Sequence, residues 1–275
     1  MKEMENNTDY NHYRIAVPSI FDEVFSHFYF AENRSGEALT LTLLPSYQTI
    51  MVFSFGTPIS FITRQNDQVE IDKCLVVGPI KQAVDYTLPP ASEILVANFK
   101  DDAFFRFFGS ASIGARLTAD PDHLLDDNCF TLLWTELSRM NTTDARVNHL
   151  LDFCRPYIRD RNEVAGQIAS FDNEGLSAIK EISEKSSLSE RSVQINHKKH
   201  FGYSAKEISR YQRFFKAIQL IQAIAIEDTK IDWFEVIHQC GYYDQSQLIH
   251  DFKHYLNLSP SKYLKFQQGI CNPRS

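Results

Sequence analysis

The amino-acid sequence predicts an α+β protein of two domains, an antiparallel β sandwich or barrel followed by an all-helical domain. Short apolar runs separated by Gly and Pro fill most of the first hundred residues, which is typical of strands. Apolar residues then recur at spacings of three and four, which is typical of helices. The length of 275 residues favours two domains, and we place them at residues 1–160 and 161–275.

Six short runs predict the strands of the first domain. Leu39, Leu41 and Leu43 alternate with Thr, which is the two-residue period of a half-buried strand. We expect strands at residues 24–30, 38–44, 49–55, 69–77, 83–88 and 93–99. This spacing favours a sandwich or small barrel. The 21 Phe and 12 Tyr are interpreted as core, with the lining of a ligand pocket as the alternative.

A helical tail is predicted to complete the first domain. Helical periodicity begins near Asp102 and continues over residues 130–140. Over residues 144–158 one helix face carries Val147, Leu150, Leu151, Cys154 and Ile158.

The composition is that of a folded cytoplasmic protein. Apolar residues make up 43% of the chain, and no run approaches the ~18 uncharged residues that a membrane span requires. The first residues are polar and acidic, unlike a secretory signal. The cysteines are odd in number and scattered, which indicates reduced thiols: Cys74, Cys129, Cys154, Cys240 and Cys271. We therefore exclude secreted, membrane-spanning and disulfide-framework proteins.

The charge is distributed unevenly along the chain. Taken alone, the net charge of −7 argues against a polyanionic partner. Residues 1–170, however, hold 14 basic and 23 acidic residues, whereas residues 171–275 hold 14 and 12. The C-terminal part is thus mildly basic and is able to approach DNA.

A device that ends one helix and begins the next occurs twice, 55 residues apart. In the first copy Gly202 ends a helix, and Ser204 with Glu207 forms a capping box. In the second copy Asn257 takes the left-handed position and Ser259 caps the next helix. At the same offset Ser189 and Asp244 are expected to cap the preceding helices, Val193 corresponds to Leu248, and His197 corresponds to Phe252.

Each of these helices is preceded by another short one, predicted at residues 176–185 and 232–239. Two short helices joined by a tight turn define a helix-turn-helix unit, with Ser187 and Gly241 in the two turns. A continuous helix is predicted between the units, over residues 205–226. Its length of ~33 Å is close to the ~34 Å between successive major grooves on one face of DNA.

Residues 160–268 resemble the AraC/XylS family of bacterial transcription regulators. The match to the family signature lies in three segments: Cys240-Gly241-Tyr242-Tyr243-Asp244-Gln245-Ser246-Gln247-Leu248, Phe252-Lys253 and Leu258-Ser259-Pro260-Ser261-Lys262-Tyr263. The resemblance implies a DNA-binding domain with two helix-turn-helix units bridged by one long helix. The first domain resembles the cupin-like effector or dimerisation domains that precede such modules.

The sequence departs from the family pattern at several positions. Both recognition helices usually carry an Arg where this chain has Ile195 and His250. Ser183 and Ile237 replace the small Ala of each first helix, and His197 replaces the usual Phe. A bidentate contact from Arg to guanine, worth ~1–3 kcal/mol, is therefore missing from both units.

The resemblance assigns roles to exposed polar residues, for which simple solvation is the alternative. The base-contacting residues are expected to be Arg191, Gln194, Ile195, Ser246, Gln247 and His250. Phosphate contacts are expected from Lys198, Lys199, Lys206, Arg210, Lys253 and Lys262. For Ile195, packing in the core is a further alternative.

We predict a regulator without catalytic activity, metal or cofactor. His250 and His254 are four residues apart, but the Glu of a zinc-protease motif and a third ligand are missing. The predicted partner is double-stranded promoter DNA, with no membrane partner. RNA polymerase, a small-molecule effector and a second copy of the chain remain open as further partners. The alternative is an enzyme or small-molecule-binding protein built on the β-rich domain, with a vestigial helical domain.

Overall fold

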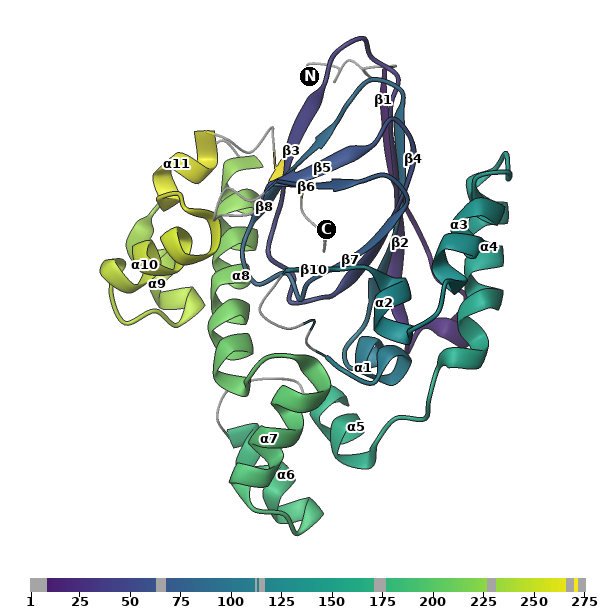
Figure 1. The fold of residues 1–275 in the computed structure, drawn as a ribbon. Coiled ribbons are helices and arrows are strands. Elements are labelled where there is room, and N and C mark those ends of the chain that lie inside the picture. The colour runs from purple at the N-terminus through teal and green to yellow at the C-terminus, as the bar shows by residue number, and fades with distance from the viewer. Residues whose placement is uncertain are drawn as a thin grey trace.

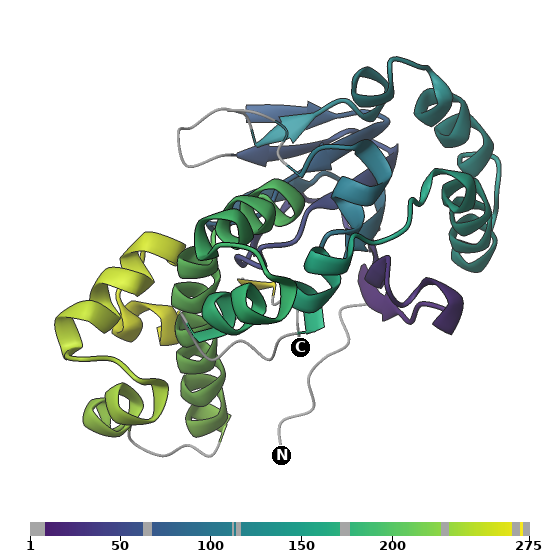
Figure 2. The ribbon, with the colours of Figure 1, turned by 90° about the horizontal axis from the view of Figure 1, so that it is seen from below.

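The computed structural model describes residues 9–62, 68–111, 113, 117–170, 177–226, 231–265 and 270–271. It shows a β-rich domain with a helical domain beside it (Figure 1). Helices α3 (Cys129–Leu137) and α4 (Thr143–Cys154) cover the side of the β-rich domain that faces away from the helical domain. A second view, from below, shows the same arrangement (Figure 2). The predicted α+β class and the order of its two parts are confirmed.

The β-rich domain consists of two sheets whose pairs are antiparallel except at β11. The first sheet has the order β1 (Tyr10–Ile15), β2 (Phe25–Asn33), β9 (Ser92–Phe99), β4 (Ile50–Gly56), β7 (Cys74–Val77) and β10 (Thr118–Ala119). The second has the order β11 (Ile270–Cys271), β3 (Leu39–Leu43), β8 (Val84–Leu88), β5 (Ile59–Ile62) and β6 (Gln68–Ile71).

The central strands β4 and β9 are buried on both faces. Ile50 and Val52 of β4 face the core between the sheets, whereas Met51 and Phe53 face the helices. An antiparallel strand with both faces covered loses the alternation of apolar and polar residues that marks a half-exposed strand. This burial explains why residues 50–53 form one continuous apolar run.

Apolar runs in the sequence did not predict β1 or β5, and they predicted β6 and β7 as a single strand. Strand β1 lies at a sheet edge and is largely polar, and β5 begins directly after the Gly-Thr-Pro turn that follows β4. Residues 69–77 form two strands in different sheets, because the chain crosses between the sheets at Asp72 and Lys73. Apolar periodicity does not reveal such a crossing, since both sheets contribute to the same core.

Phenylalanines fill the core between the first sheet and the helices of the first domain. Phe25, Phe28, Phe53, Phe99 and Phe130 are all buried there. This core holds α3 and α4 against the sheet, together with α1 (Ala103–Phe108) and α2 (Pro121–Leu125). Single-turn helices lie at Ser19–Phe21 and Arg155–Tyr157. Most aromatic residues of the first domain are thus core, as the sequence predicted.

The helical domain is built around the long helix α8 (Ala205–Ile226), whose predicted bounds are confirmed. Figure 1 shows α8 upright beside the β-rich domain, with one helix pair near its start and a second group along its outer side. The remaining helices are α5 (Glu163–Ser170), α6 (Ser177–Ser186), α7 (Glu190–Phe201), α9 (Trp233–Cys240), α10 (Gln245–Leu256) and α11 (Pro260–Lys265). The predicted first residue of α6, Leu176, lies outside the described residues. Within the described ranges, no helix is long and apolar enough to span a membrane.

The repeated device that ends one helix and begins the next is confirmed. Gly202 and Asn257 end α7 and α10 in the left-handed conformation, with φ of 78° and 60°. The Ser204 hydroxyl accepts a hydrogen bond from the Glu207 backbone amide, and the Glu207 carboxylate accepts one from the Ser204 amide. In the second copy Ser259 caps α11. These caps fix where each helix starts and therefore which residues its first turn presents.

A buried ion-pair cluster joins the first domain to the segment that leads into the helical domain. The Asp102 side chain is fully buried and lies 2.9 Å from Arg161 Nε and 3.4 Å from Arg106 Nε. Arg161 precedes α5, so this cluster attaches the start of the helical domain to α1. A buried charge without a partner is costly, which keeps the three side chains together.

We expect Asp102→Asn to lower the free energy of unfolding by about 3–5 kcal/mol, because two guanidinium groups lose their buried counter-charge. Urea denaturation of the full chain measures this. Asp101→Asn is the matched control, because Asp101 is partly exposed and lies 3.7 Å from Arg161, so it should cost less than about 1 kcal/mol. Equal effects of the two substitutions would contradict this account of the junction.

Candidate nucleic-acid interface

Three serines hold the turn between α6 and α7, the first helix pair. Ser187 occupies the turn with a φ of 56°. The Ser183 hydroxyl donates to the Leu188 carbonyl at 2.6 Å, so this replacement of the usual Ala ties α6 to the turn. Ser189 caps α7 by accepting a hydrogen bond from the Ser192 backbone amide at 3.2 Å. The first pair therefore keeps a defined turn despite its unusual sequence.

Helix α7 presents its predicted base-contacting residues to solvent. Arg191, Gln194 and Ile195 are exposed, while Val193 is buried and holds the opposite face of the helix in the core. Ile195 is 59% exposed, so the alternative that it packs in the core is wrong. An exposed Ile on this face is placed to contact an apolar group such as a thymine methyl.

The second pair, α9 and α10, meets at Gly241, which ends α9 with a φ of 73°. Asp244 caps α10 by accepting a hydrogen bond from the Gln247 amide at 2.8 Å. The Gln247 side-chain oxygen in turn accepts one from the Tyr243 amide at 2.9 Å. This reciprocal pair fixes the first turn of α10 and leaves the amide group of Gln247 to donate outward. Ser246 is exposed beside it.

Two exposed residues of the second pair were not among those expected from the sequence. Gln245 is the first residue of α10 and is exposed. Tyr243, in the turn before it, is 92% exposed. Their exposure was predictable from their position directly next to the Asp244 cap, because the first residues of a capped helix project from its end. Both extend the surface formed by Ser246 and Gln247.

The predicted phosphate-contacting residues divide into two groups. Lys198, Lys206, Lys253 and Lys262 are exposed on or beside the helix pairs. Lys199 is also exposed, but its Nζ lies 5.8 Å from the centre of the Phe105 ring in the first domain. Arg210 is bound within the helical domain: its Nε lies 2.6 Å from Asp251 Oδ1, and its Nη2 lies 3.0 Å from His250 Nδ1.

Two histidines of α7 are buried. His197 Nδ1 donates to the Tyr203 carbonyl at 2.7 Å, and burial lowers the pKa of His197. The His200 ring lies 4.2 Å from the Phe105 ring of α1, and burial lowers the pKa of His200 as well. His197 therefore fills the position of the usual Phe as a neutral ring in the core.

The two domains share an interface centred on α8. Tyr47, in the loop between β3 and β4, is buried, and its ring lies 4.8 Å from that of Tyr211 and 5.1 Å from that of Tyr203. Three polar contacts accompany it: Tyr211 Oη to the Pro45 carbonyl, Lys81 Nζ to Glu207 Oε1, and the Ala83 amide to the Tyr255 carbonyl, each at 2.8 Å. The first domain thus touches α8 and the end of α10.

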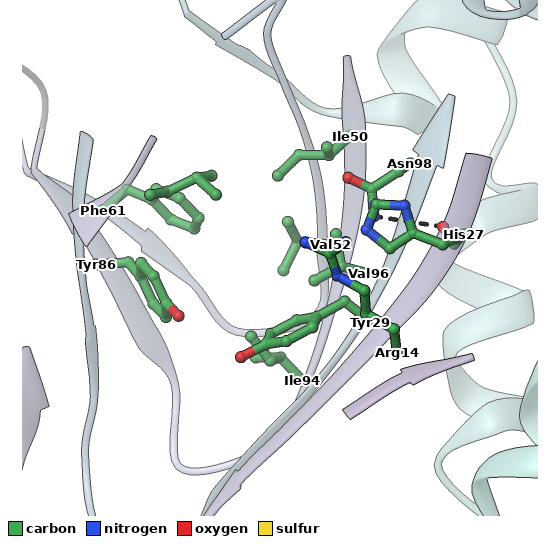
Figure 3. Close-up of a pocket in the computed structure, with 11 residues that line it drawn as sticks. Arg14, His27, Tyr29, Ile50, Val52, Phe61, Tyr86, Ile94, Val96 and Asn98 are labelled. Carbon is green, nitrogen blue, oxygen red and sulfur yellow. Dashed lines mark hydrogen bonds between the residues drawn. The ribbon is translucent and has the colours of Figure 1, made fainter. Parts of the chain in front are cut away.

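A cavity of about 50 Å³ lies between the two sheets of the first domain. Ile50, Val52, Ile94 and Val96 face Phe61 and Tyr86 of the opposite sheet across it (Figure 3). Arg14, His27, Tyr29 and Asn98 form a more polar side. Burial, followed by the charge of Arg14, lowers the pKa of His27 to about 4. The cavity thus combines apolar walls with a fixed positive charge.

The described cysteines are free thiols, and two of them are strongly affected by burial. Cys74, Cys129, Cys154 and Cys240 are free thiols. Burial raises the pKa of Cys74 to about 12 and also raises that of Cys154, which keeps both thiols protonated at neutral pH. Among the described residues, no group of three or more His, Cys, Asp or Glu side chains is placed to hold a metal ion.

Comparison with known families identifies the helical domain. Residues 182–265 match the family model described as a helix-turn-helix domain, which is of the AraC type. This part of the chain is therefore similar to AraC-type helix-turn-helix domains. The resemblance predicted from the sequence is confirmed.

Comparison with solved structures gives distant similarities. A crystal structure of ToxT from Vibrio cholerae O395 aligns with 96% of this chain and 100% of that chain, at 12% identity and a TM-score of 0.40. Wild-type ToxT from V. cholerae strain SCE256 with bound unsaturated fatty acid aligns at 11% identity, 96% and 97% coverage, and a TM-score of 0.36. An RmlC-like cupin protein from Desulfovibrio desulfuricans aligns with 34% of this chain and 85% of that chain, at 11% identity and a TM-score of 0.27. No curated protein sequence matches the chain.

We expect the stability of the protein to fall in mild acid, in part through His197. Its pKa in the folded state lies below the ordinary value of 6.5. As the pH falls below 6.5, the unfolded chain therefore binds a proton that the folded chain resists, and this costs up to about 1.4 kcal/mol per pH unit until the folded pKa is reached. Urea denaturation at pH 7.5 and 5.5 of wild type and His197→Phe measures this.

The His197→Phe variant should lose less stability on acidification than wild type, because Phe does not titrate. Other buried histidines, such as His200, contribute equally to both proteins and cancel in the comparison. The same pH dependence in both proteins would show that His197 is not buried as a neutral ring.

Proposed function

We propose that this protein is a cytoplasmic, sequence-specific transcription regulator whose helices α7 and α10 read successive major grooves of promoter DNA. The observation that carries this proposal is the pair of helices with matching caps, α7 and α10, both packed on α8 within an AraC-type domain. The 22 residues of α8 span ~33 Å, close to the ~34 Å repeat of B-DNA. We place the boundary between the regulatory and DNA-binding domains at residues 160 and 161.

The two reading helices each begin beside one acidic side chain. Asp244 caps α10, and Glu190 is the first residue of α7. The helices differ instead in how firmly their first turns are held, because the Gln247 amide bonds the Asp244 side chain and the Gln247 side chain bonds the Tyr243 amide. We therefore propose that α10 makes the tighter base contacts, through Gln245, Ser246, Gln247 and His250, and that Arg191, Gln194 and Ile195 of α7 add a second, weaker element.

Phosphate contacts supply most of the affinity in this proposal. The exposed cations beside the reading helices are Lys198, Lys206, Lys253 and Lys262. Each lysine that neutralises a phosphate releases a counterion, so affinity falls as salt rises. This salt dependence distinguishes a DNA-binding domain from a vestigial one.

We expect the full chain to retain a defined motif from a randomised duplex library at low salt. For the selected duplex, Lys253→Gln should lower the affinity and reduce the slope of log K against log salt by about 0.9, because one phosphate contact is lost. Fluorescence anisotropy titrations at several salt concentrations measure both quantities.

Lys73→Gln is the matched control, because it makes the same charge change on an exposed lysine of the first domain. Its affinity and salt slope should equal those of wild type. If wild type retains no DNA at any salt concentration, or if both variants change alike, the proposed DNA interface is wrong.

We further propose that the first domain regulates the second through the segment Leu43-Leu44-Pro45. Leu43 lines the cavity, Leu44 packs in the core of the helical domain, and the Pro45 carbonyl accepts the hydrogen bond of Tyr211 on α8. Three consecutive residues thus connect the cavity wall to the bridging helix. A ligand that moves Leu43 would change how the first domain holds α8.

The lining of the cavity favours a small, largely apolar molecule with an anionic group. Apolar side chains cover most of the walls, and Arg14 supplies a positive charge on the polar side. With about 50 Å³ in this conformation, a ligand of more than a few heavy atoms has to displace lining side chains.

A thermal-shift screen tests this ligand class. Small carboxylic acids with apolar bodies should raise the melting temperature of wild type, because binding to the folded state stabilises it. The matched primary alcohols, which lack the charge, should raise it less. Arg14→Met should abolish the difference between acids and alcohols; a difference that persists in Arg14→Met would contradict the role of Arg14.

A further inference from the structure

Arg210 of α8 holds two consecutive residues of the reading helix α10. Its Nε lies 2.6 Å from Asp251 Oδ1, and its Nη2 lies 3.0 Å from His250 Nδ1. Asp251 is 1% exposed, and Arg213, one turn further along α8, binds its other oxygen at 3.2 Å. The Arg210 guanidinium also lies 5.6 Å from the centre of the Tyr255 ring. These contacts hold the guanidinium in one orientation.

The contact between Arg210 and His250 decides where the imidazole carries its proton. A guanidinium group has only donors, so it cannot accept a hydrogen bond from His250. Nδ1 of His250 must therefore accept, which requires a neutral ring with its hydrogen on Nε2. Among the described residues no hydrogen-bond partner of Nε2 is found, and His250 is exposed. The ring thus presents a single N–H donor outward from α10.

We propose that Arg210 is a positioning residue that fixes His250 as an Nε2–H donor and so determines which base α10 accepts at one position. This proposal rests on the proposed DNA-reading function. In the major groove guanine offers two adjacent acceptors, N7 and O6, whereas cytosine offers the N4 amino group, a donor. A ring fixed as a donor therefore favours guanine most and cytosine least at the base it meets.

This role differs from the phosphate contact expected for Arg210 from the sequence. Its Nε and Nη2 atoms are both engaged within the protein, so Arg210 acts on DNA through His250. A single imidazole donor also replaces the usual Arg at this position of the family pattern. Arg210 and His250 together thus present one outward N–H donor. The Arg that is usual at this position in the family presents several N–H donors in a planar fork.

Nitrogen-15 NMR of the full chain, with labelled histidine, tests the tautomer without DNA. The His250 resonances are assigned by their absence in His250→Gln. In wild type we expect Nδ1 to show the shift of an unprotonated ring nitrogen and Nε2 that of a protonated one. In Arg210→Met the two forms should exchange, because Nδ1 has lost its donor.

Arg213→Met is the matched control, because it also removes a partner of Asp251 but does not contact His250. It should leave the His250 resonances as in wild type. If Arg210→Met fails to fold, Arg210→Lys is the second variant, since it keeps a positive charge opposite Asp251 but cannot bond both partners with a fixed fork. The same exchange is expected there.

Selection from a randomised duplex library provides the second measurement. Wild type and Arg213→Met should prefer guanine over cytosine at one position by roughly three- to tenfold, the worth of one hydrogen bond. Arg210→Met should lose most of this preference and keep the preferences at other positions.

Each outcome has a definite meaning. An Nδ1–H form in wild type, or an unchanged Nε2–H form in Arg210→Met, would overturn the positioning role. Unchanged base preference in Arg210→Met would overturn the specificity role. Wild-type protein that shows the Nε2–H form but retains no DNA would overturn the DNA-reading function, and with it the base preference, while supporting the positioning of His250 by Arg210.

Discussion

The packing of α8 is the constraint on which the rest of the structure depends. Tyr211, Phe214 and Ile218 form a buried stripe on this helix, and one continuous core joins it to both helix pairs. Leu44, Tyr47 and Ala83 of the first domain belong to the same core. The first domain and the two helix pairs all pack on this single helix. A change in the position of any one of them therefore alters the surface against which the others pack.

Buried polar groups fix the geometry at two junctions between elements. Asp102 joins α1 to the segment before α5, and Asp251 joins α10 to α8, each with two arginines. In both clusters a buried carboxylate would be costly without its partners, so the elements are held in one arrangement. Apolar contacts alone would allow small shifts of one helix over another, whereas these directional contacts do not.

In the first domain the sequence pattern predicted the fold class but not the arrangement of the strands. Its class was predictable, because strands end at Gly and Pro and because Leu39, Leu41 and Leu43 alternate with Thr. The assignment of strands to sheets was not, since β4 and β9 are buried on both faces and the run 69–77 crosses between sheets. The cavity was equally hidden, because its lining comes from seven strands, and Arg14 lies on a strand that was missed.

The sequence by itself determined the local devices of the helical domain. The caps at Ser189, Asp244 and Ser259, and the left-handed ends at Gly202 and Asn257, were predictable because each depends on residues no more than four positions apart. The exposed faces of α7 and α10 followed from these caps.

Only the tertiary structure decided how the capped helices pack against one another and against the first domain. Arg210 lies 41 residues from Asp251, Tyr211 lies 166 residues from Pro45, and Lys199 reaches Phe105 across the domain interface. No periodicity encodes such contacts, because they depend on how whole elements pack against one another. Arg210, which was expected from its charge to contact a phosphate, is in the folded chain the partner of the buried Asp251 carboxylate and of His250.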